Sequence, residues 1–503
     1  MSEIFKSFKS TAIQSAFYSI GNLAGKLSGV ILLPVYALYL PIEIFGLYAL
    51  FEVIFQLFQV FSGLGIKLGL TRWYWDEDTT PNKKSLFFTT FTFNVAICIL
   101  LSIALYFGFN YLSVYYFKTD IQPDIILLFI SGNLIKLLSD VPMLLLRVQH
   151  RAKKHSFVQI IQLLVFVGLV VVFLAVFKMK LEGIFWATLL SAIIQFVILV
   201  PVIIANSELK FEFRLLKDML TYGFPVALGN MVNITFNFTD KYFINWFSNL
   251  KNVGTFTLAH KISNIVNLLI VNAFINAYMH TYFKGVNSSS NDRFFSRSFT
   301  YFLTGITFCS LILIVFIDEA IVLFAANNES YFNSATIVPV LTIGLVFGGI
   351  RHMLTLPINK IKRTRVIGVI SILSGALNVY LNYLLIPIWY SLGAAYATGI
   401  VQVISSLVLL IFVLKNLNIV FEWKRIFILF LDSAIVLLAL YIVHIDHLLL
   451  NLLYKTGLVI FWILFIYLSG FLLIEEKRRI KHFWLKWKKL SSLLHNIKSL
   501  KDK

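Results

Sequence analysis

Two adjacent charged residues, Asp240 and Lys241, lie within residues 219–247, a segment that otherwise has the character of a membrane helix. A charged side chain at the centre of a bilayer costs about 3 kcal/mol on insertion scales, so such residues usually face a bundle interior or a wet cavity. Neighbouring residues of an α-helix point about 100° apart, so this carboxylate and this ammonium group cannot stack well on each other. We therefore expect each of them to contact a different helix.

Polar side chains recur at intervals of three and four along four apolar segments, and this spacing places each set on one helix face. The four sets are Gln14, Tyr18, Asn22 and Lys26; Glu52, Gln56 and Gln59; Asn230, Asn233, Asn237 and Asp240 or Lys241; and His260, Asn264 and Asn267. Cationic groups pair with anions, and side-chain amides donate to and accept from hydroxyl groups. We predict a cavity for an anionic, hydroxyl-rich ligand, lined by Lys26, Lys241, Lys261, Arg351, Asn22, Gln56, Asn237 and Asn264.

Five ionisable residues of the predicted spans are candidates for ion pairs or for proton transfer: Glu52, Lys136, Asp140, Asp240 and His260. Lys136 and Asp140 are four residues apart, which favours an ion pair along one helix over contact with a ligand. Glu52 and His260 could relay protons, but buried polar residues at equivalent positions of a repeat can equally hold two halves together. The lysines, too, could be structural partners of these acids.

The elements that carry these residues are membrane spans. The chain of 503 residues is 59% hydrophobic and 13% charged, whereas soluble domains carry about 25% charged residues. Apolar segments long enough to cross a bilayer, about 20 residues, recur along its whole length. Fourteen are predicted: 12–39, 44–66, 86–110, 122–146, 156–177, 182–205, 219–247, 252–280, 295–317, 333–357, 366–386, 391–414, 426–445 and 452–474.

Lysine and arginine are distributed unequally between the two sides of these spans. With the N-terminus inside, 33 of the 43 fall on the cytoplasmic side and 5 on the other side. This bias predicts that both termini are cytoplasmic. It also accounts for the net charge of +19 without a nucleic-acid partner. Cys98 and Cys309 lie inside predicted spans and lack the spacing of a metal site or a disulfide, so no metal or cofactor is predicted.

The sequence contains an internal duplication. The hexapeptide that begins at Gly183 (GIFWAT) returns at Gly393 (GAAYAT), and the segment around Gly46 matches the segment around Gly254 at an offset of 208. An even number of helices separates the copies, which makes this a parallel repeat. We predict a lobe of six helices at 1–209, a second at 210–415, two further helices at 416–475 and a basic amphipathic tail at 476–503 that lies on the anionic inner membrane surface.

The stretches 33–50 (LPVYALYLPIEIFGLYAL), 63–75 (GLGIKLGLTRWYW), 240–262 (DKYFINWFSNLKNVGTFTLAHKI) and 360–398, from KIKRTR to GAAYAT, carry a resemblance to a known family. The chain resembles the polysaccharide flippases of the multidrug, oligosaccharidyl-lipid and polysaccharide (MOP) exporter superfamily, especially the Wzx-type translocases of O-antigen and capsule repeat units. The resemblance covers nearly the whole chain.

This resemblance implies an all-α polytopic membrane protein of about fourteen transmembrane helices, with two six-helix lobes and two appended C-terminal helices. It implies that the protein is not an enzyme. It would move undecaprenyl-diphosphate-linked oligosaccharides from the inner to the outer leaflet of the bacterial cytoplasmic membrane by alternating access, through a cationic cavity. The expected partners are this lipid-linked substrate, membrane lipids, and polymerase or chain-length proteins of the same pathway.

Three alternatives are weighed against this function. A lipid II flippase shares the chemistry and differs in cargo. A cation-coupled exporter of small molecules favours an acidic cavity, which the excess of lysine here opposes. A membrane glycosyltransferase, polymerase or ligase would need catalytic groups on a sizeable loop, whereas the longest predicted outer loop, 318–332, contains only three charged residues, all acidic.

Overall fold

The computed structural model describes residues 29–76, 82–284 and 291–478, and the regular elements of these residues are helices. Their bounds are α2 Leu33–Tyr39, α3 Ile42–Gly63, α4 Ile66–Trp73, α5 Lys83–Leu112, α6 Pro123–Leu138, α7 Asp140–Val148, α8 Ala152–Val171, α9 Leu181–Asn206, α10 Phe213–Phe247, α11 Leu250–Val266, α12 Asn272–Lys284, α13 Asn291–Val315, α14 Ile317–Phe324, α15 Ser334–Lys360, α16 Thr364–Asn416, α17 Trp423–Ile442 and α18 Leu448–Leu468. The predicted all-α fold class is confirmed.

Eleven helical segments of the described residues are long and apolar enough to cross a membrane. Three of the fourteen predicted spans are not separate members of these eleven. The spans 366–386 and 391–414 form the single helix α16, which bends at Tyr390, where φ is 48° and ψ is −124°. α10 covers the span 219–247, and the span 12–39 begins outside the described residues and ends in α2. The protein is therefore a multi-pass membrane protein.

Two short helices, α4 and α14, were not predicted. α3 ends at Gly63 because the next two residues, Leu64 (φ 40°) and Gly65 (φ 84°), adopt the left-handed conformation, which interrupts a helix. Gly65 also lies against α10, since a Cβ atom at this position would be 2.2 Å from the carbonyl carbon of Gly223. The break therefore seats α4 directly on α10.

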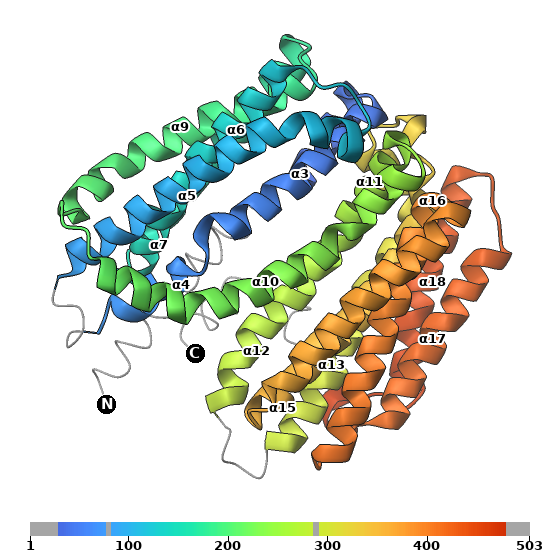
Figure 1. The fold of residues 1–503 in the computed structure, drawn as a ribbon. Helices are drawn as coiled ribbons and strands as arrows, with labels where there is room; N and C mark the ends of the chain where they lie inside the picture. The colour runs from blue at the N-terminus through green and yellow to red at the C-terminus, as the bar shows by residue number, and fades with distance from the viewer. Residues whose placement is uncertain (1–28, 77–81, 285–290, 479–503) are drawn as a thin grey trace, which may run out of the picture. The chain divides into compact units, whose positions relative to one another are not determined.

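α3 and α11 meet at equivalent positions of the predicted repeat (Figure 1). A Cβ atom on Gly46 would lie 2.1 Å from the carbonyl oxygen of Leu250, and one on Gly254 would lie 2.4 Å from that of Ile42. Both pairs of residues, 42 with 250 and 46 with 254, are 208 positions apart. The contact is therefore reciprocal, as a two-fold relation between two copies requires.

α10 contributes to the packing of both halves. Near its start, Leu216 and Met219 belong to a buried apolar cluster with Ile66 of α4, Val141 of α7 and Val202 of α9. Near its end, α10 is bonded to α16 through Asp240. A single helix therefore connects the core of the first half to the helices of the second.

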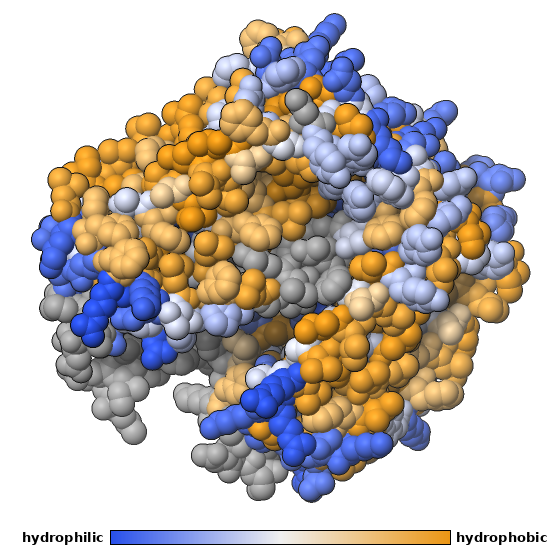
Figure 2. Space-filling view, viewed as in Figure 1, coloured by the Kyte–Doolittle hydropathy of each residue, from blue (hydrophilic) through white to orange (hydrophobic). Residues whose placement is uncertain are grey.

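Apolar residues cover the outward faces of α5, α6 and α9, and hydrophilic residues gather at the ends of these helices (Figure 2). Exposed apolar side chains on these helices include Phe107 and Ile204, which are 77% and 71% exposed. An apolar band bounded by polar ends is the surface that a bilayer requires.

The chain divides into two compact units, one comprising Met1–Ala273 and Ile317–Phe412, the other Phe274–Phe316 and Val413–Lys503. In the second unit α13, α17 and α18 pack together. The ring of Phe308 stacks on that of Trp462 at 5.1 Å, and the indole of Trp462 donates a hydrogen bond of 3.0 Å to Ser433 Oγ. Residues 479–503, which include most of the predicted tail, lie outside the described residues.

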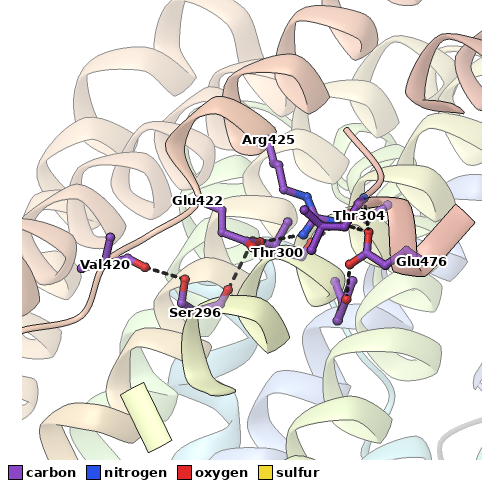
Figure 3. A network of polar contacts seen from close by, with 9 residues as sticks. Ser296, Thr300, Thr304, Val420, Glu422, Arg425 and Glu476 are labelled. Carbon is purple, nitrogen blue, oxygen red and sulfur yellow. Dashed lines mark hydrogen bonds and ion pairs between the residues drawn. The ribbon is translucent and has the colours of Figure 1, made fainter. Parts of the chain in front are cut away.

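A buried arginine organises one end of this second unit (Figure 3). The guanidinium of Arg425, which is 6% exposed, donates to Glu422 and to Glu476, each at 2.9 Å. Glu476 also accepts from the hydroxyl of Tyr301 on α13 and from the backbone N–H of Leu473. Breaking a buried pair of this kind costs about 3–5 kcal/mol, so this cluster fixes the segment after α18 to α13 and α17.

Candidate functional site

Glu52 of α3 connects two lysines that the sequence places on different helices. The Nζ atom of Lys261 on α11 lies 2.8 Å from Glu52 Oε1, and the Nζ atom of Lys241 on α10 lies 3.9 Å from Oε2. Lys241 is buried, with 7% of the residue exposed. α3 presents Glu52 here because its apolar face, with Leu47 and Phe51, is buried in the first half. Three helices therefore meet at two cationic groups that share one carboxylate.

Asp240 is bonded to α16 rather than to its neighbour Lys241. Its Oδ1 accepts from the amide of Asn382 at 2.5 Å, and its Oδ2 accepts from the hydroxyl of Thr398 at 2.8 Å. The amide of Asn382 also donates to Asn378, and that of Asn378 donates to Thr398. The prediction that Asp240 and Lys241 contact different helices is confirmed.

The sequence alone does not identify the three partners of Asp240. A signal for them exists: Asn378 and Asn382 are four residues apart in the predicted span 366–386, and Thr398 closes the repeated hexapeptide. Hydroxyl and amide groups at such positions of an apolar helix need partners in a membrane. They were not identified as partners of Asp240 because nothing in the spacing indicates which distant carboxylate they meet.

The predicted ion pair between Lys136 and Asp140 is wrong in its choice of partner. Asp140 accepts from Lys67 of α4, with the two charged atoms 2.6 Å apart. Asp140 lies where α7 follows α6, and Lys67 of α4 is close enough there to pair with it. The ammonium of Lys136 instead lies 4.7 Å from the centre of the Phe55 ring.

Most of the described candidates line two cavities, whereas Lys241 and Asp140 are in the wall of neither. The first cavity has a volume of about 350 Å³ and lies among α2, α3, α6, α8, α9 and α11, with Glu52, Gln56, Lys136 and Lys261 in its wall. The second cavity has a volume of about 560 Å³ and lies among α10, α11, α15 and α16. Its wall contains the predicted residues Asp240, His260, Asn264 and Arg351.

Residues 13–279, more than half of the 503-residue chain, match the sequence profile of the family described as polysaccharide biosynthesis protein. The chain belongs to this polysaccharide biosynthesis family. No curated protein matches it by sequence.

Solved structures with the same fold include flippases and exporters. The lipid II flippase MurJ, in an inward closed conformation, matches with a TM-score of 0.75 and 16% identity over 90% of this chain and 98% of that chain. An inward-facing multidrug resistance MATE family transporter of the MOP superfamily matches with a TM-score of 0.64 and 14% identity over 78% and 93%. The Vibrio cholerae MATE transporter VcmN matches at 0.59 and 13% identity over 83% and 99%. At these identities the likeness establishes the shared fold.

In this member of the polysaccharide biosynthesis family, the charges of the site do not cancel. Two ammonium groups share the carboxylate of Glu52, while the carboxylate of Asp240 is satisfied by neutral amide and hydroxyl groups. Arg351 adds a further cation to the wall of the second cavity. An arrangement with excess positive charge in a medium of low dielectric favours an anion.

Three of the predicted cavity residues cannot be placed against this geometry. Asn22 and Lys26 lie outside the described residues, and the side chain of Asn237, within α10, also lies outside them. Their part in the site therefore stays a prediction.

Proposed function

We propose that the protein flips undecaprenyl-diphosphate-linked oligosaccharide repeat units from the inner to the outer leaflet of the bacterial cytoplasmic membrane. The product would serve the synthesis of a surface polysaccharide. One observation carries the proposal: Lys241 and Lys261 lie inside the helix bundle and share the single carboxylate of Glu52. Membership of the polysaccharide biosynthesis family and the fold shared with flippases support it.

The chemistry of the cargo explains why such a pair is needed. A diphosphate carries about two negative charges, and moving it through a bilayer without cationic partners is prohibitive. Lysine ammonium groups that already share a carboxylate can exchange this partner for a phosphate oxygen without ever being left unpaired. Alternating access of two lobes would then carry the diphosphate and its sugars across, while the polyprenyl chain stays in contact with lipid.

The same geometry bears on the two alternative transport functions. A small-molecule exporter that takes cations would need an acidic site, and here Glu52 is outnumbered by its lysine partners. A lipid II flippase would carry the same diphosphate, so the lysines do not distinguish it. The family match favours polysaccharide cargo over peptidoglycan precursors.

The test is complementation of a strain that lacks its polysaccharide flippase, together with binding of undecaprenyl diphosphate to the purified protein. A hydrogen bond to a charged group contributes about 1.5–3 kcal/mol. Lys241→Gln and Lys261→Gln should therefore each weaken binding about 10- to 100-fold and reduce surface polysaccharide. Lys251→Gln, at an exposed position on the same helix as Lys261, is the matched control. Full complementation by the double variant at normal protein level would show that these lysines are structural partners of Glu52.

A further inference from the structure

The wall of the first cavity is unusually rich in aromatic rings. Phe51, Phe129 and Phe185 form a closely packed floor, with ring centres 4.8–5.2 Å apart, and each of the three is almost fully buried. Tyr48 packs against this floor, with its ring centre 6.5 Å from that of Phe185. These three phenylalanines are thus part of the packed core, and the other aromatic rings of the wall are the ones available to a ligand.

Two phenylalanine rings of this wall, Phe55 and Phe166, stack on no other ring among the described residues, and the ammonium of Lys136 lies 4.7 Å from the centre of the Phe55 ring. Phe166 of α8 is half-buried and lines the cavity. Gln162 lies one helical turn before it and also lines the cavity. Within the described ranges, its side-chain amide, like that of Gln56 on α3, is not engaged by another residue. An aromatic face and two unused amides therefore face the same space.

The second cavity is an internal comparison, because it occupies the equivalent place in the repeat. Gln56 corresponds to Asn264 at the offset of 208. The wall of the first cavity includes Gln162 and Phe166 of α8, whereas that of the second includes Ile370 and Ser374 of α16. The wall of the second cavity contains no phenylalanine, tyrosine or tryptophan among the described residues. The two cavities therefore share a position in the fold but differ in the chemistry of their walls.

We propose that the first cavity is the subsite that binds a sugar ring of the lipid-linked cargo and that it sets the preference for the glycan. A pyranose ring offers an apolar face of C–H groups, which suits the negative face of an aromatic ring, and hydroxyl groups, which suit amides that both donate and accept. A volume of about 350 Å³ lies within the usual range of small-ligand sites. This inference rests on the proposed function.

The composition of the wall argues against other occupants. A polyprenyl chain would leave the amides of Gln56 and Gln162 unpaired in an apolar site, which is costly. A cationic drug would meet Lys136 and Lys261 in the same wall. Lys261, which is bonded to Glu52, lies at the boundary between this cavity and the lysine pair, so a sugar in the cavity would be next to a diphosphate held by the lysines.

The experiment measures a ratio rather than a single affinity. The dissociation constant of the purified full-length protein is determined for undecaprenyl diphosphate and for undecaprenyl diphosphate carrying N-acetylglucosamine or galactose. The wild type should bind at least one glycolipid more tightly than the bare lipid. Phe166→Ala and Gln162→Ala should each reduce this preference about tenfold, or to one where the wild-type preference is smaller, without changing the affinity for the bare lipid.

Controls separate recognition from folding. Phe166→Leu keeps the apolar volume and should lose the preference, whereas Phe166→Tyr keeps the ring and should retain it. Ser374→Ala and Ile370→Ala, in the wall of the second cavity, should leave the preference unchanged. If these two substitutions abolish the preference while those at Phe166 and Gln162 keep it, the sugar subsite is in the wrong cavity and the inference fails.

Different binding results would overturn the sugar subsite and the proposed function. A wild type that binds the bare lipid and both glycolipids equally overturns the sugar subsite alone. A wild type that prefers a glycolipid, with the preference intact in Phe166→Ala and Gln162→Ala, also overturns it. A wild type that binds none of the three lipids overturns the proposed function and the inference with it.

Discussion

At the scale of single residues, Glu52 is the side chain on which the site depends. It holds Lys261 at 2.8 Å and Lys241 at 3.9 Å, and it lines the first cavity. A carboxylate next to the lysines weakens their attraction for an anion and at the same time keeps them paired when no anion is bound. We therefore expect Glu52 to affect both the strength of anion binding and the stability of the empty protein.

Replacing Glu52 with glutamine tests the effect of this residue on anion binding and on stability. The substitution removes one negative charge from the surroundings of the diphosphate, so binding of undecaprenyl diphosphate should tighten about tenfold, which corresponds to about 1.4 kcal/mol. The empty protein should unfold more readily, because two buried ammonium groups are left without their carboxylate. Lipid binding and thermal unfolding, measured on the same preparation, check both effects. Unchanged binding of undecaprenyl diphosphate would show that Glu52 is not part of the anion site.

At the scale of elements, the sequence was most informative where a helix crosses the membrane and least informative where helices meet. The spans could be predicted because length and apolar character are properties of local sequence. The polar face of α3, with Glu52 and Gln56, follows from helical spacing in the same way. The partner of Asp140 could not be predicted, since it depends on Lys67 of α4 being brought beside it by the fold.

The crossing of α3 and α11 gives a prediction at this scale. Gly46→Ala and Gly254→Ala each place a methyl group 2.1–2.4 Å from a backbone carbonyl oxygen of the other helix, so the helices must separate. Each substitution should lower the thermal unfolding temperature and reduce transport. Gly108→Ala on α5 and Gly168→Ala on α8 are the controls, because a Cβ atom there meets nothing within 4 Å. Those controls should be neutral or stabilising by up to about 1 kcal/mol.

The same controls show which result would contradict this prediction. If Gly46→Ala behaves like Gly168→Ala in unfolding and transport, the close approach of the two helices is not needed.

At the scale of the whole molecule, the distribution of basic residues is the property that orients the chain. The terminal segments and the short loops on one side of the spans together hold 33 of the 43 lysines and arginines, and such a bias directs membrane insertion. We propose from it that both termini lie in the cytoplasm.

Reporter fusions check the proposed orientation. Fusions after Lys154, Lys217 and Lys362 should report a cytoplasmic location, because each follows an even number of predicted spans. Fusions near Lys118, Asn327 and Asp446 should report the outside. A single inner site found outside would contradict fourteen spans with cytoplasmic termini.

The reciprocal glycine contact also bears on how a duplicated chain can diverge. Each glycine is opposed by a carbonyl oxygen of the other copy, so a larger residue in either half disturbs both. Both copies must therefore keep glycine at this position. The cavity walls consist mostly of helices of one half, with Lys261 of α11 as the exception in the first cavity, and so carry less of this mutual constraint. One wall could become aromatic and the other hydroxylic, so the ancestral symmetry persists at the crossing while the interiors are free to specialise.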